Sequence, residues 1–438
     1  MVLTSILADY ILAQPLDWGL MQGIALVTWL VIVAVGFVHN IGIISRVSTK
    51  LCLSLLSLFV FLSVGEGFFR IIGFDFGGEV RAWRKIPVFY RMPIAPTGTV
   101  FFKRPGPEQW TGQVLNTRLK QLGILPNPYM NEPVITVEYD RKGFRNPDHM
   151  SDWEVAVAGD SFTELGYLPY EELFTSILAR LLGVSVINLG TSYTGPLTQL
   201  SYLDDYGISA STKDTIIMFF EGNDLDDLAD EYKALLRWRQ TGQRDYRASS
   251  KQTSLVKALN GVVEHVHRKL SHRDESDYIT AYFKSPQGDI PVTLNYTPPG
   301  SSELPKETMQ HLNYFFRKYA DFGKDRHVTV WLAYLPTKRR VLHGQIEFAG
   351  GAAERLRNWQ PTDLPEVISE LCDQYGIRFI DLTPALIREA KHNKQLLYNS
   401  IYDTHLNSHG SLVVGQELAR HFSGQNLRSP NKMLQPTR

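Results

Sequence analysis

The stretch VAVAGDSFTEL, residues 155–165, runs from a short apolar segment into Gly159, Asp160 and Ser161 and then into residues that can open a helix. Glycine permits a tight strand-to-helix turn, which leaves the side chain after it exposed. The amide of that residue lies at a helix N-terminus, where anions bind. The stretch therefore predicts a strand whose carboxyl end presents the hydroxyl of Ser161.

The chain after Trp153 continues with the same strand-and-helix pattern. Residues 170–183 place several apolar side chains on one helical face, as a helix that covers a sheet requires: Leu173, Phe174, Ile177, Leu178, Leu181 and Leu182. Further buried strands are expected at residues 184–190, 215–224, 328–336 and 376–384. Strands that alternate with helices indicate parallel βα units. We therefore predict an α/β fold, a three-layer α/β/α sandwich with about five parallel strands.

Polar residues follow the expected strands, at the edge of a parallel sheet where ligands bind. Gly190 ends the second strand, Asn223 and Asp224 end the third, and Asp403 and His405 precede a helix at residues 411–422. These positions, together with Ser161, define a candidate site.

The ordered blocks GDSF (159–162), NLGTSYTG (188–195), GND (222–224) and DTHLN (403–407) resemble those of the SGNH hydrolases, also called the GDSL esterase and lipase superfamily. The resemblance covers Trp153 to about Phe422 and implies a flavodoxin-like sheet and ester hydrolysis. The lead-in YDRKGFRNP (139–147) is similar to that of exported, membrane-anchored bacterial members.

Two departures from the family pattern concern the substrate more than the fold. Glu221 replaces the glycine that usually opens the third block, and Gly222 follows it. One residue, instead of the usual two, separates Asp403 from His405. The shorter spacing is similar to that of membrane-linked and polysaccharide-acetylation branches.

The chemistry of these residue types supports a catalytic site. A serine hydroxyl is a weak nucleophile until a base takes its proton, and a third group fixes the tautomer of that base. We expect Ser161 to be the nucleophile, His405 the general base and then acid, and Asp403 the residue that orients His405. The amides of Ser161 and Gly190, with the side chain of Asn223, would form the oxyanion hole.

Other polar residues of these blocks are expected to be structural. Asp160 and Asp224 would bond loop amides, Asn407 would cap the last helix, and His409 would face solvent. Only two cysteines occur, Cys52 and Cys372, so a cysteine-based metal site or a disulfide within the soluble part is not expected. We predict no cofactor and no metal.

The N-terminal residues 1–72 are expected to form a membrane anchor. Leu20–Ile44 is uncharged and long enough to span a bilayer, and Leu51–Gly65 is a shorter second candidate. Arg46 and Lys50 lie between them, whereas residues 1–19 contain no Lys or Arg. The positive-inside bias puts that loop in the cytoplasm and the rest of the chain outside. A cleaved signal peptide is the alternative.

The remaining boundaries follow from composition. Residues 73–152 are expected to be a linker and a small β lead-in, 153–425 the hydrolase domain and 426–438 a tail. A helical insertion is expected at about 229–303, and within it residues 233–273 carry ten Lys and Arg against two acids. This basic stretch is a solvated surface or, alternatively, a cradle for an anionic glycan or lipid headgroup.

Over the whole chain, the numbers of basic and acidic residues are equal, 45 each, so the net charge gives no indication of nucleic-acid binding.

Three function classes follow. The first is a serine esterase of the plasma membrane with a periplasmic catalytic domain, which removes acyl groups, with acetyl expected, from an extracytoplasmic glycan or lipid. The second is an acyltransferase that passes the acyl group from Ser161 to a sugar hydroxyl. The third is a catalytically silent glycan-binding protein. Polysaccharide-assembly proteins are possible partners, and hydrolysis is our prediction.

Overall fold

The computed structural model describes residues 133–241, 278–401 and 403–423, the segments 90–93, 100–103 and 107–113, and the single positions Ser54, Ser57 and Phe61. The chain divides into two compact units, Met1–Val88 with Arg247–Ser271 and Phe89–Tyr246 with His272–Arg438. All described residues except the three single positions belong to the second unit.

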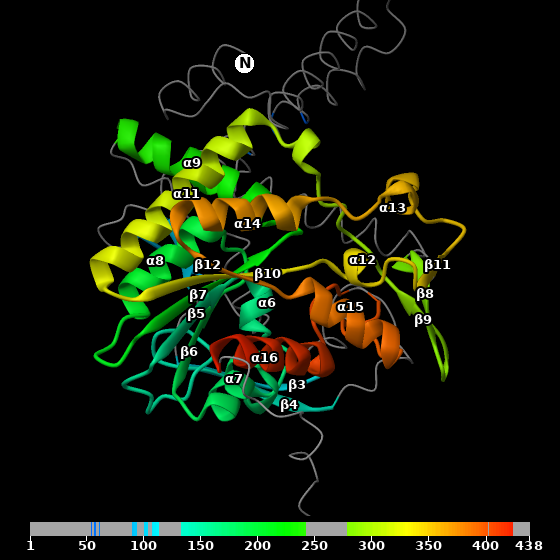
Figure 1. Cartoon of the computed structure of the whole chain (residues 1–438), viewed down its shortest axis with the longest axis horizontal. Helices are drawn as coiled ribbons and strands as arrows, with labels where there is room; N and C mark the ends of the chain where they lie inside the picture. The colour runs from blue at the N-terminus through cyan, green and yellow to red at the C-terminus, as the bar shows by residue number, and fades with distance from the viewer. Residues whose placement is uncertain are drawn as a thin grey trace, which may run out of the picture. The chain divides into compact units, whose positions relative to one another are not determined.

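A five-stranded parallel sheet forms the centre of this unit (Figure 1). Its strands are β5 (Val155–Gly159), β6 (Val186–Gly190), β7 (Asp214–Phe220), β10 (Thr329–Leu335) and β12 (Arg378–Asp381). The strand order β12-β10-β7-β5-β6 corresponds to 2-1-3-4-5 when it is read from the β6 edge, which is the flavodoxin-like order. The predicted sheet of about five parallel strands is therefore confirmed.

Helices cover both faces of the sheet (Figure 1). One layer contains α8 (Pro196–Tyr206), α9 (Asp224–Thr241), α11 (Lys306–Arg326) and α14 (Leu364–Tyr375). The other contains α6 (Ser161–Glu164), α7 (Phe174–Leu182), α15 (Thr383–His392) and α16 (Ser408–Phe422). Alternate strand residues supply two hydrophobic cores: Val155 and Val157 pack in one, and Ala156 and Ala158 in the other. The three-layer sandwich follows from this alternation.

Helix α7 shows how the sequence pattern becomes packing. Of the six apolar residues expected on its inner face, Leu173, Phe174, Ile177 and Leu178 are buried, whereas Leu181 is 37% exposed. The 3-10 turn at Tyr170–Glu172 precedes α7, which begins at Phe174. Helix α16 packs against α7 so closely that a Cβ at Gly415 would lie 2.7 Å from Ile177.

The lead-in before Trp153 is part of the folded domain. Strand β4 (Ile135–Tyr139) pairs antiparallel with β3 (Glu108–Gly112), and a turn follows at residues 141–146. Arg145 is 1% exposed and donates to the carbonyls of Leu165 and Leu168. A further antiparallel pair joins β1 (Tyr90–Pro93) to β2 (Val100–Lys103).

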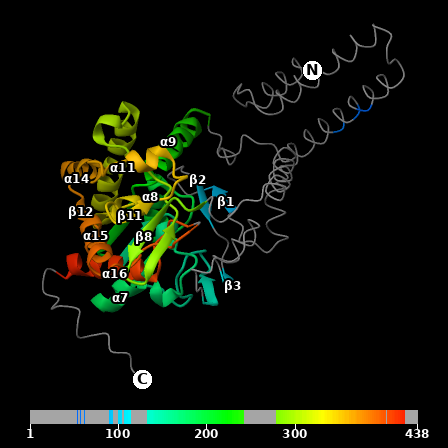
Figure 2. The same ribbon diagram turned by 90° about the vertical axis from the view of Figure 1, so that its right-hand side faces the viewer.

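The helical insertion expected at about 229–303 is described only at its two ends, with a helix at the first and a β-hairpin at the second. Helix α9 extends to Thr241, residues 242–277 lie outside the described ranges, and β8 (Ala281–Ser285) and β9 (Gly288–Val292) form a hairpin. A third strand, β11 (Ile346–Phe348), pairs with β8. This small sheet lies on the side of the unit that faces the viewer in Figure 2. The hairpin forms because Ala281 and Phe283 alternate with more exposed residues.

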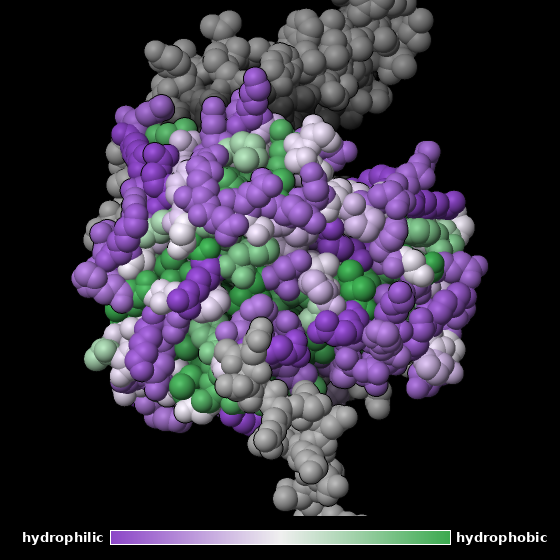
Figure 3. Space-filling view, in the orientation of Figure 1, coloured by the Kyte–Doolittle hydropathy of each residue, from purple (hydrophilic) through white to green (hydrophobic). Residues whose placement is uncertain are grey.

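Shorter helices complete the described part of the unit: α12 (Lys338–Val341), α13 (Glu354–Asn358) and the 3-10 turn Ser301–Glu303. Within the described ranges, no helix is long and apolar enough to cross a membrane. The two predicted membrane spans, and most of the basic stretch 233–273, fall outside those ranges. The face drawn in Figure 3 is covered mainly by hydrophilic residues.

Candidate active site

Ser161 lies where the strand order of the sheet reverses. It is the first residue of α6 and follows β5, whose neighbours are β6 on one side and β7 on the other. The Oδ1 atom of Asp160 caps α6 by accepting from the amide of Phe162 at 2.8 Å. A Cβ at Gly159 would lie 2.0 Å from Thr163 Oγ1, so the tight turn into α6 needs glycine.

Three of the predicted side chains form a continuous chain of hydrogen bonds. His405 Nε2 lies 2.7 Å from Ser161 Oγ, and His405 Nδ1 lies 2.9 Å from Asp403 Oδ1. The amide of His405 also donates to Asp403 Oδ1 at 2.8 Å, as does Asn399 Nδ2 at 3.1 Å. The structure thus brings the hydroxyl, the imidazole and the carboxylate together although 244 positions separate Ser161 from His405.

The surroundings of Asp403 keep it ionised. Its side chain is buried, and burial alone would raise the pKa of the carboxyl. The charge of His405 and the hydrogen bonds from His405 and Asn399 outweigh that effect and hold the pKa well below its usual range. An ionised Asp403 can keep the proton of His405 on Nδ1, so that Nε2 can accept the proton of Ser161, with which it is in contact.

Two aromatic rings pack against the imidazole of His405. The rings of Phe162 and Tyr167 have centroids 4.5 and 5.8 Å from that of His405. The Tyr167 hydroxyl donates to the carbonyl of Leu406 at 2.8 Å, next to His405 in the chain. The orientation of His405 therefore depends on α6 and the segment after it, as well as on Asp403.

The prediction that the Gly190 amide belongs to an oxyanion hole is wrong. This amide donates to the Oδ1 atom of Asn188 at 2.8 Å, so it is not directed at a reacting oxygen. A Cβ at Gly190 would lie 2.3 Å from the amide nitrogen of Glu164. Gly190 instead allows the end of β6 to pack directly against α6.

Asn223 lies beside acidic residues. Its Nδ2 atom donates to Asp227 Oδ2 at 2.6 Å, which engages one of its two amide hydrogens. The oxyanion role of Asn223 and of the Ser161 amide stays a prediction.

Asp160, Asp224 and Asp227 form an acidic group, here called the acidic cluster, behind the serine turn. Burial raises the pKa of Asp160 and of Asp227 to about 6, and it raises that of Asp224 well above its usual range. Asp224 Oδ2 accepts from the amide of Phe220 at 2.8 Å. Among the described residues, none forms a hydrogen bond with Asp160 Oδ2 or Asp224 Oδ1. The structural role predicted for these two residues agrees with the loop amides they bond.

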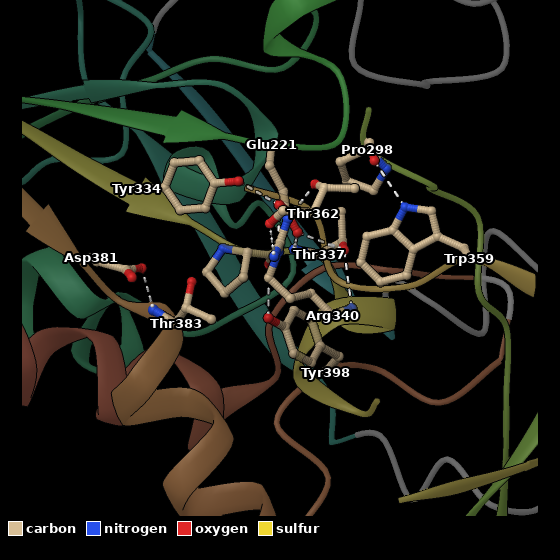
Figure 4. Close-up of polar contacts among 11 residues, drawn as sticks. Glu221, Pro298, Tyr334, Thr337, Arg340, Trp359, Thr362, Asp381, Thr383 and Tyr398 are labelled. Atoms are coloured by element: carbon tan, nitrogen blue, oxygen red, sulfur yellow. Dashed lines mark hydrogen bonds and ion pairs between the residues drawn. The ribbon is translucent and has the colours of Figure 1, made fainter. Parts of the chain in front are cut away.

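Glu221, the departure from the family glycine, is part of a buried network (Figure 4). Its Oε2 atom lies 2.7 Å from Arg340 Nε and accepts from the Tyr334 hydroxyl. Its Oε1 atom accepts from the amide and the hydroxyl of Thr337 at 2.7 and 2.8 Å. Arg340 donates onward to Thr362. The carboxylate is fully engaged inside the protein, so Glu221 stabilises the ends of β7 and β10.

Sequence reasoning missed two ionisable residues near the site, the half-buried Glu231 and the buried Lys338. Glu231 of α9 accepts from the amides of Gly195 and Leu197 at the start of α8. Lys338 of α12 donates to the loop that carries Asp403. In a run of charged residues, the sequence does not distinguish a residue that packs inside the protein from its exposed neighbours, so no local signal marked either one.

Asn407 caps α16, as predicted. His409 was expected to face solvent; it is half-buried, and its Nε2 atom lies 2.9 Å from Glu389 Oε1. In the described ranges, no group of three His, Cys, Asp or Glu residues could hold a metal ion.

Solved esterase structures are similar to this chain. One is a carbohydrate acetylesterase from Sinorhizobium meliloti, with 14% identity over 62% of this chain and 99% of the other and a TM-score of 0.31. Another is a catalytic mutant of an acetylxylan esterase from Geobacillus stearothermophilus, with 14% identity over 65% and 100% and a TM-score of 0.33. The M. smegmatis aryl esterase is 15% identical over 63% and 100%, with a TM-score of 0.27.

No protein-family model and no curated protein sequence matches the chain. TM-scores this low leave the function to be decided by the geometry of the site itself. The flavodoxin-like strand order, with Ser161 after β5 and His405 in contact with it, is the arrangement that the resemblance to the SGNH hydrolases predicted.

Proposed function

We propose that this protein is an SGNH-type serine esterase with Ser161, His405 and Asp403 as its catalytic triad. The single observation that carries the proposal is the hydrogen-bonded chain from Ser161 Oγ through His405 to the ionised Asp403. A serine–histidine contact of 2.7 Å is within the range that proton transfer requires. A general base of this kind typically contributes about 100- to 10,000-fold to the rate.

The reaction has two steps. Ser161 Oγ attacks the ester carbonyl carbon while His405 Nε2 takes the hydroxyl proton, and the tetrahedral intermediate collapses when His405 returns that proton to the departing alcohol. Water then attacks the acyl-enzyme, His405 removes its proton, and the carboxylic acid leaves as Ser161 regains a proton. Asp403 stabilises the imidazolium that forms in each step.

We propose an acylated carbohydrate as the substrate, with acetyl as the acyl group. Tyr193 supports this choice: it is 72% exposed and stands in the loop after β6 with a φ of 66°. A non-glycine residue in this left-handed conformation is strained by about 1 kcal/mol, and such strain is concentrated at functional sites. The amide and hydroxyl of neighbouring Ser192 both bond Glu164 Oε2 of α6 at 2.6 Å. The loop is thus fixed to the helix that begins at Ser161, and the ring can contact the apolar face of a sugar.

An assay with the full-length chain tests both parts of the proposal. We expect the wild-type chain to release acetate both from an aryl acetate and from an acetylated oligosaccharide. The Ser161→Ala variant should release acetate from neither substrate. Tyr193→Ala should raise KM for the oligosaccharide by about tenfold, the effect of about 1.4 kcal/mol of lost contact, and leave the aryl acetate unaffected. Transfer of acetyl to an added oligosaccharide in place of release to water would identify an acyltransferase.

We also propose that the N-terminal spans anchor the chain in the plasma membrane with the catalytic domain outside the cytoplasm. The absence of Lys and Arg from residues 1–19 and the presence of Arg46 and Lys50 between the spans support this orientation. An alkaline phosphatase fused after Arg438 should be active, because that enzyme folds only outside the cytoplasm. An inactive phosphatase with an active cytoplasmic reporter at the same position would reverse the orientation.

A further inference from the structure

Lys338, the first residue of α12, is almost completely buried, with 1% of its surface exposed. Its ammonium donates to four backbone carbonyl oxygens, those of Thr293 (3.0 Å), Asn399 (2.6 Å), Ser400 (3.1 Å) and Asp403 (2.6 Å). An ammonium has three hydrogens, so four acceptors use its whole donor capacity. The side chain is therefore a fixed junction inside the protein.

Three of the four acceptors belong to one loop, described at residues 399–401 and 403, and Asp403 carries the carboxylate that contacts His405. The fourth acceptor, Thr293, directly follows β9. The amide of Thr293 in turn donates to the carbonyl of Ser400 at 3.1 Å. Lys338 thus joins the loop to the small sheet and holds the backbone of Asp403 itself.

Burial of the Lys338 ammonium favours its neutral form over its charged form. It lowers the pKa of Lys338 to about 7, and the negative charge of Asp403 acts in the opposite direction. A buried charge is costly unless it is fully hydrogen-bonded, and the four carbonyl oxygens meet that requirement here. A methionine of similar length would avoid the cost of burying a charge but would leave those carbonyl oxygens without their donor, so the lysine serves to hold the backbone that carries them.

We propose that Lys338 is a positioning residue, which holds the Asp403 backbone so that the carboxylate faces His405 Nδ1. This inference rests on the proposed function of Ser161, His405 and Asp403. The reacting atoms never contact Lys338. Its effect on the rate arises because a displacement of about 1 Å in a catalytic group can cost about 100-fold.

Arg339 provides a matched control on the same short helix. It is also buried, at 3% exposed, and also donates to backbone carbonyls, those of Leu356 at 3.1 Å and Trp359 at 2.9 Å. Neither acceptor belongs to the loop that carries Asp403 or His405. Removal of either cation should destabilise the protein, but only removal of Lys338 should disturb the triad.

The test compares Lys338→Met with Arg339→Met in the full-length chain. For hydrolysis of an aryl acetate, Lys338→Met should lower kcat about 100-fold with KM changed less than about threefold. Arg339→Met should lose stability in urea unfolding but keep kcat within about twofold. The downfield NMR resonance of the His405 Nδ1 proton, assigned by its absence from His405→Ala, should persist in Arg339→Met and shift or broaden in Lys338→Met.

Other outcomes separate this inference from the proposed function. Equal kcat values for the two variants, with an unchanged His405 resonance, would overturn the role of Lys338 while the esterase proposal stands. A wild-type chain that hydrolyses no ester would overturn the esterase proposal, and the His405 resonance would still decide whether Lys338 positions the imidazole–carboxylate pair. If Lys338→Met does not fold, Lys338→Gln, which keeps two N–H donors, is tested instead. Its kcat should lie between that of wild type and a loss of about 100-fold, and its His405 Nδ1 resonance should be shifted from the wild-type position.

Discussion

Two buried carboxylate sites lie within four residues of each other, and they are built in opposite ways. Glu221, at the end of β7, is bonded by Arg340, Thr337 and Tyr334. Asp224, at the start of α9, bonds the amide of Phe220, and no described residue bonds its Oδ1 atom. Among the described residues, no Lys or Arg forms an ion pair with the acidic cluster. Burial raises the pKa values of this cluster.

The difference in hydrogen bonding between Glu221 and the acidic cluster indicates a different structural role for each. A carboxylate with a bonded arginine and a full set of donors is a structural element, because its charge is compensated where it stands. The acidic cluster lies behind Ser161 and Asn223 and keeps its protons to a higher pH. Glu221 therefore supports the ends of the strands, whereas Asp160 and Asp224 shape the turn that presents Ser161.

The largest effect is expected at the triad, where His405 compensates the buried carboxylate of Asp403. His405→Ala and Asp403→Asn should each lower kcat by about 10,000-fold or more, because the first removes the base and the second favours the wrong tautomer. Ester hydrolysis with purified variants measures this. His409→Ala is the control, since His409 contacts Glu389 instead, and its kcat should stay near wild type. A mildly affected His405→Ala enzyme would exclude the triad.

A smaller effect, on stability, is expected at the compensated carboxylate. Arg340→Met leaves Glu221 buried and unpaired and should lower the free energy of unfolding by about 3–5 kcal/mol. Urea unfolding measures the change. Adding Glu221→Gln to that variant should restore a large part of the loss, because the uncompensated charge is then gone. A loss of less than about 1 kcal/mol in Arg340→Met would contradict the comparison.

Some of these features could be predicted from the sequence, and others could not. The strands and the triad were accessible because apolar runs end in polar residues at one edge of a parallel sheet. The hairpin at residues 281–292 was missed although a turn signal, Pro286-Gln287 followed by Gly288, lies where its two strands meet. The packing role of Gly190 depends on Asn188 and α6, and the burial of Lys338 depends on two segments distant in the chain, at Thr293 and at residues 399–403. Contacts of that kind exist only in the tertiary structure.

The smallest effect is expected in the acidic cluster, and its sign depends on pH. The pKa of Asp224 is raised in the folded chain, so the folded state holds the proton to higher pH than the unfolded state does, and stability falls as pH rises above 3.8. Asp224→Asn removes this dependence. The variant should gain on the order of 1 kcal/mol over wild type at about pH 8 and less at about pH 5.

Unfolding by urea at both pH values measures that difference. An Asp224→Asn effect that is equal at both pH values would show that the carboxyl is not perturbed.

The most direct measurement of the central claim is covalent labelling of the nucleophile. A fluorophosphonate reacts with a serine only when a base activates it, and intact mass followed by peptide mapping locates the adduct. One adduct should form, on Ser161, in the wild-type chain and in His409→Ala, and none should form in His405→Ala. An unlabelled wild-type chain, an adduct on another serine, or undiminished labelling of His405→Ala would contradict the assignment of Ser161 as the nucleophile activated by His405.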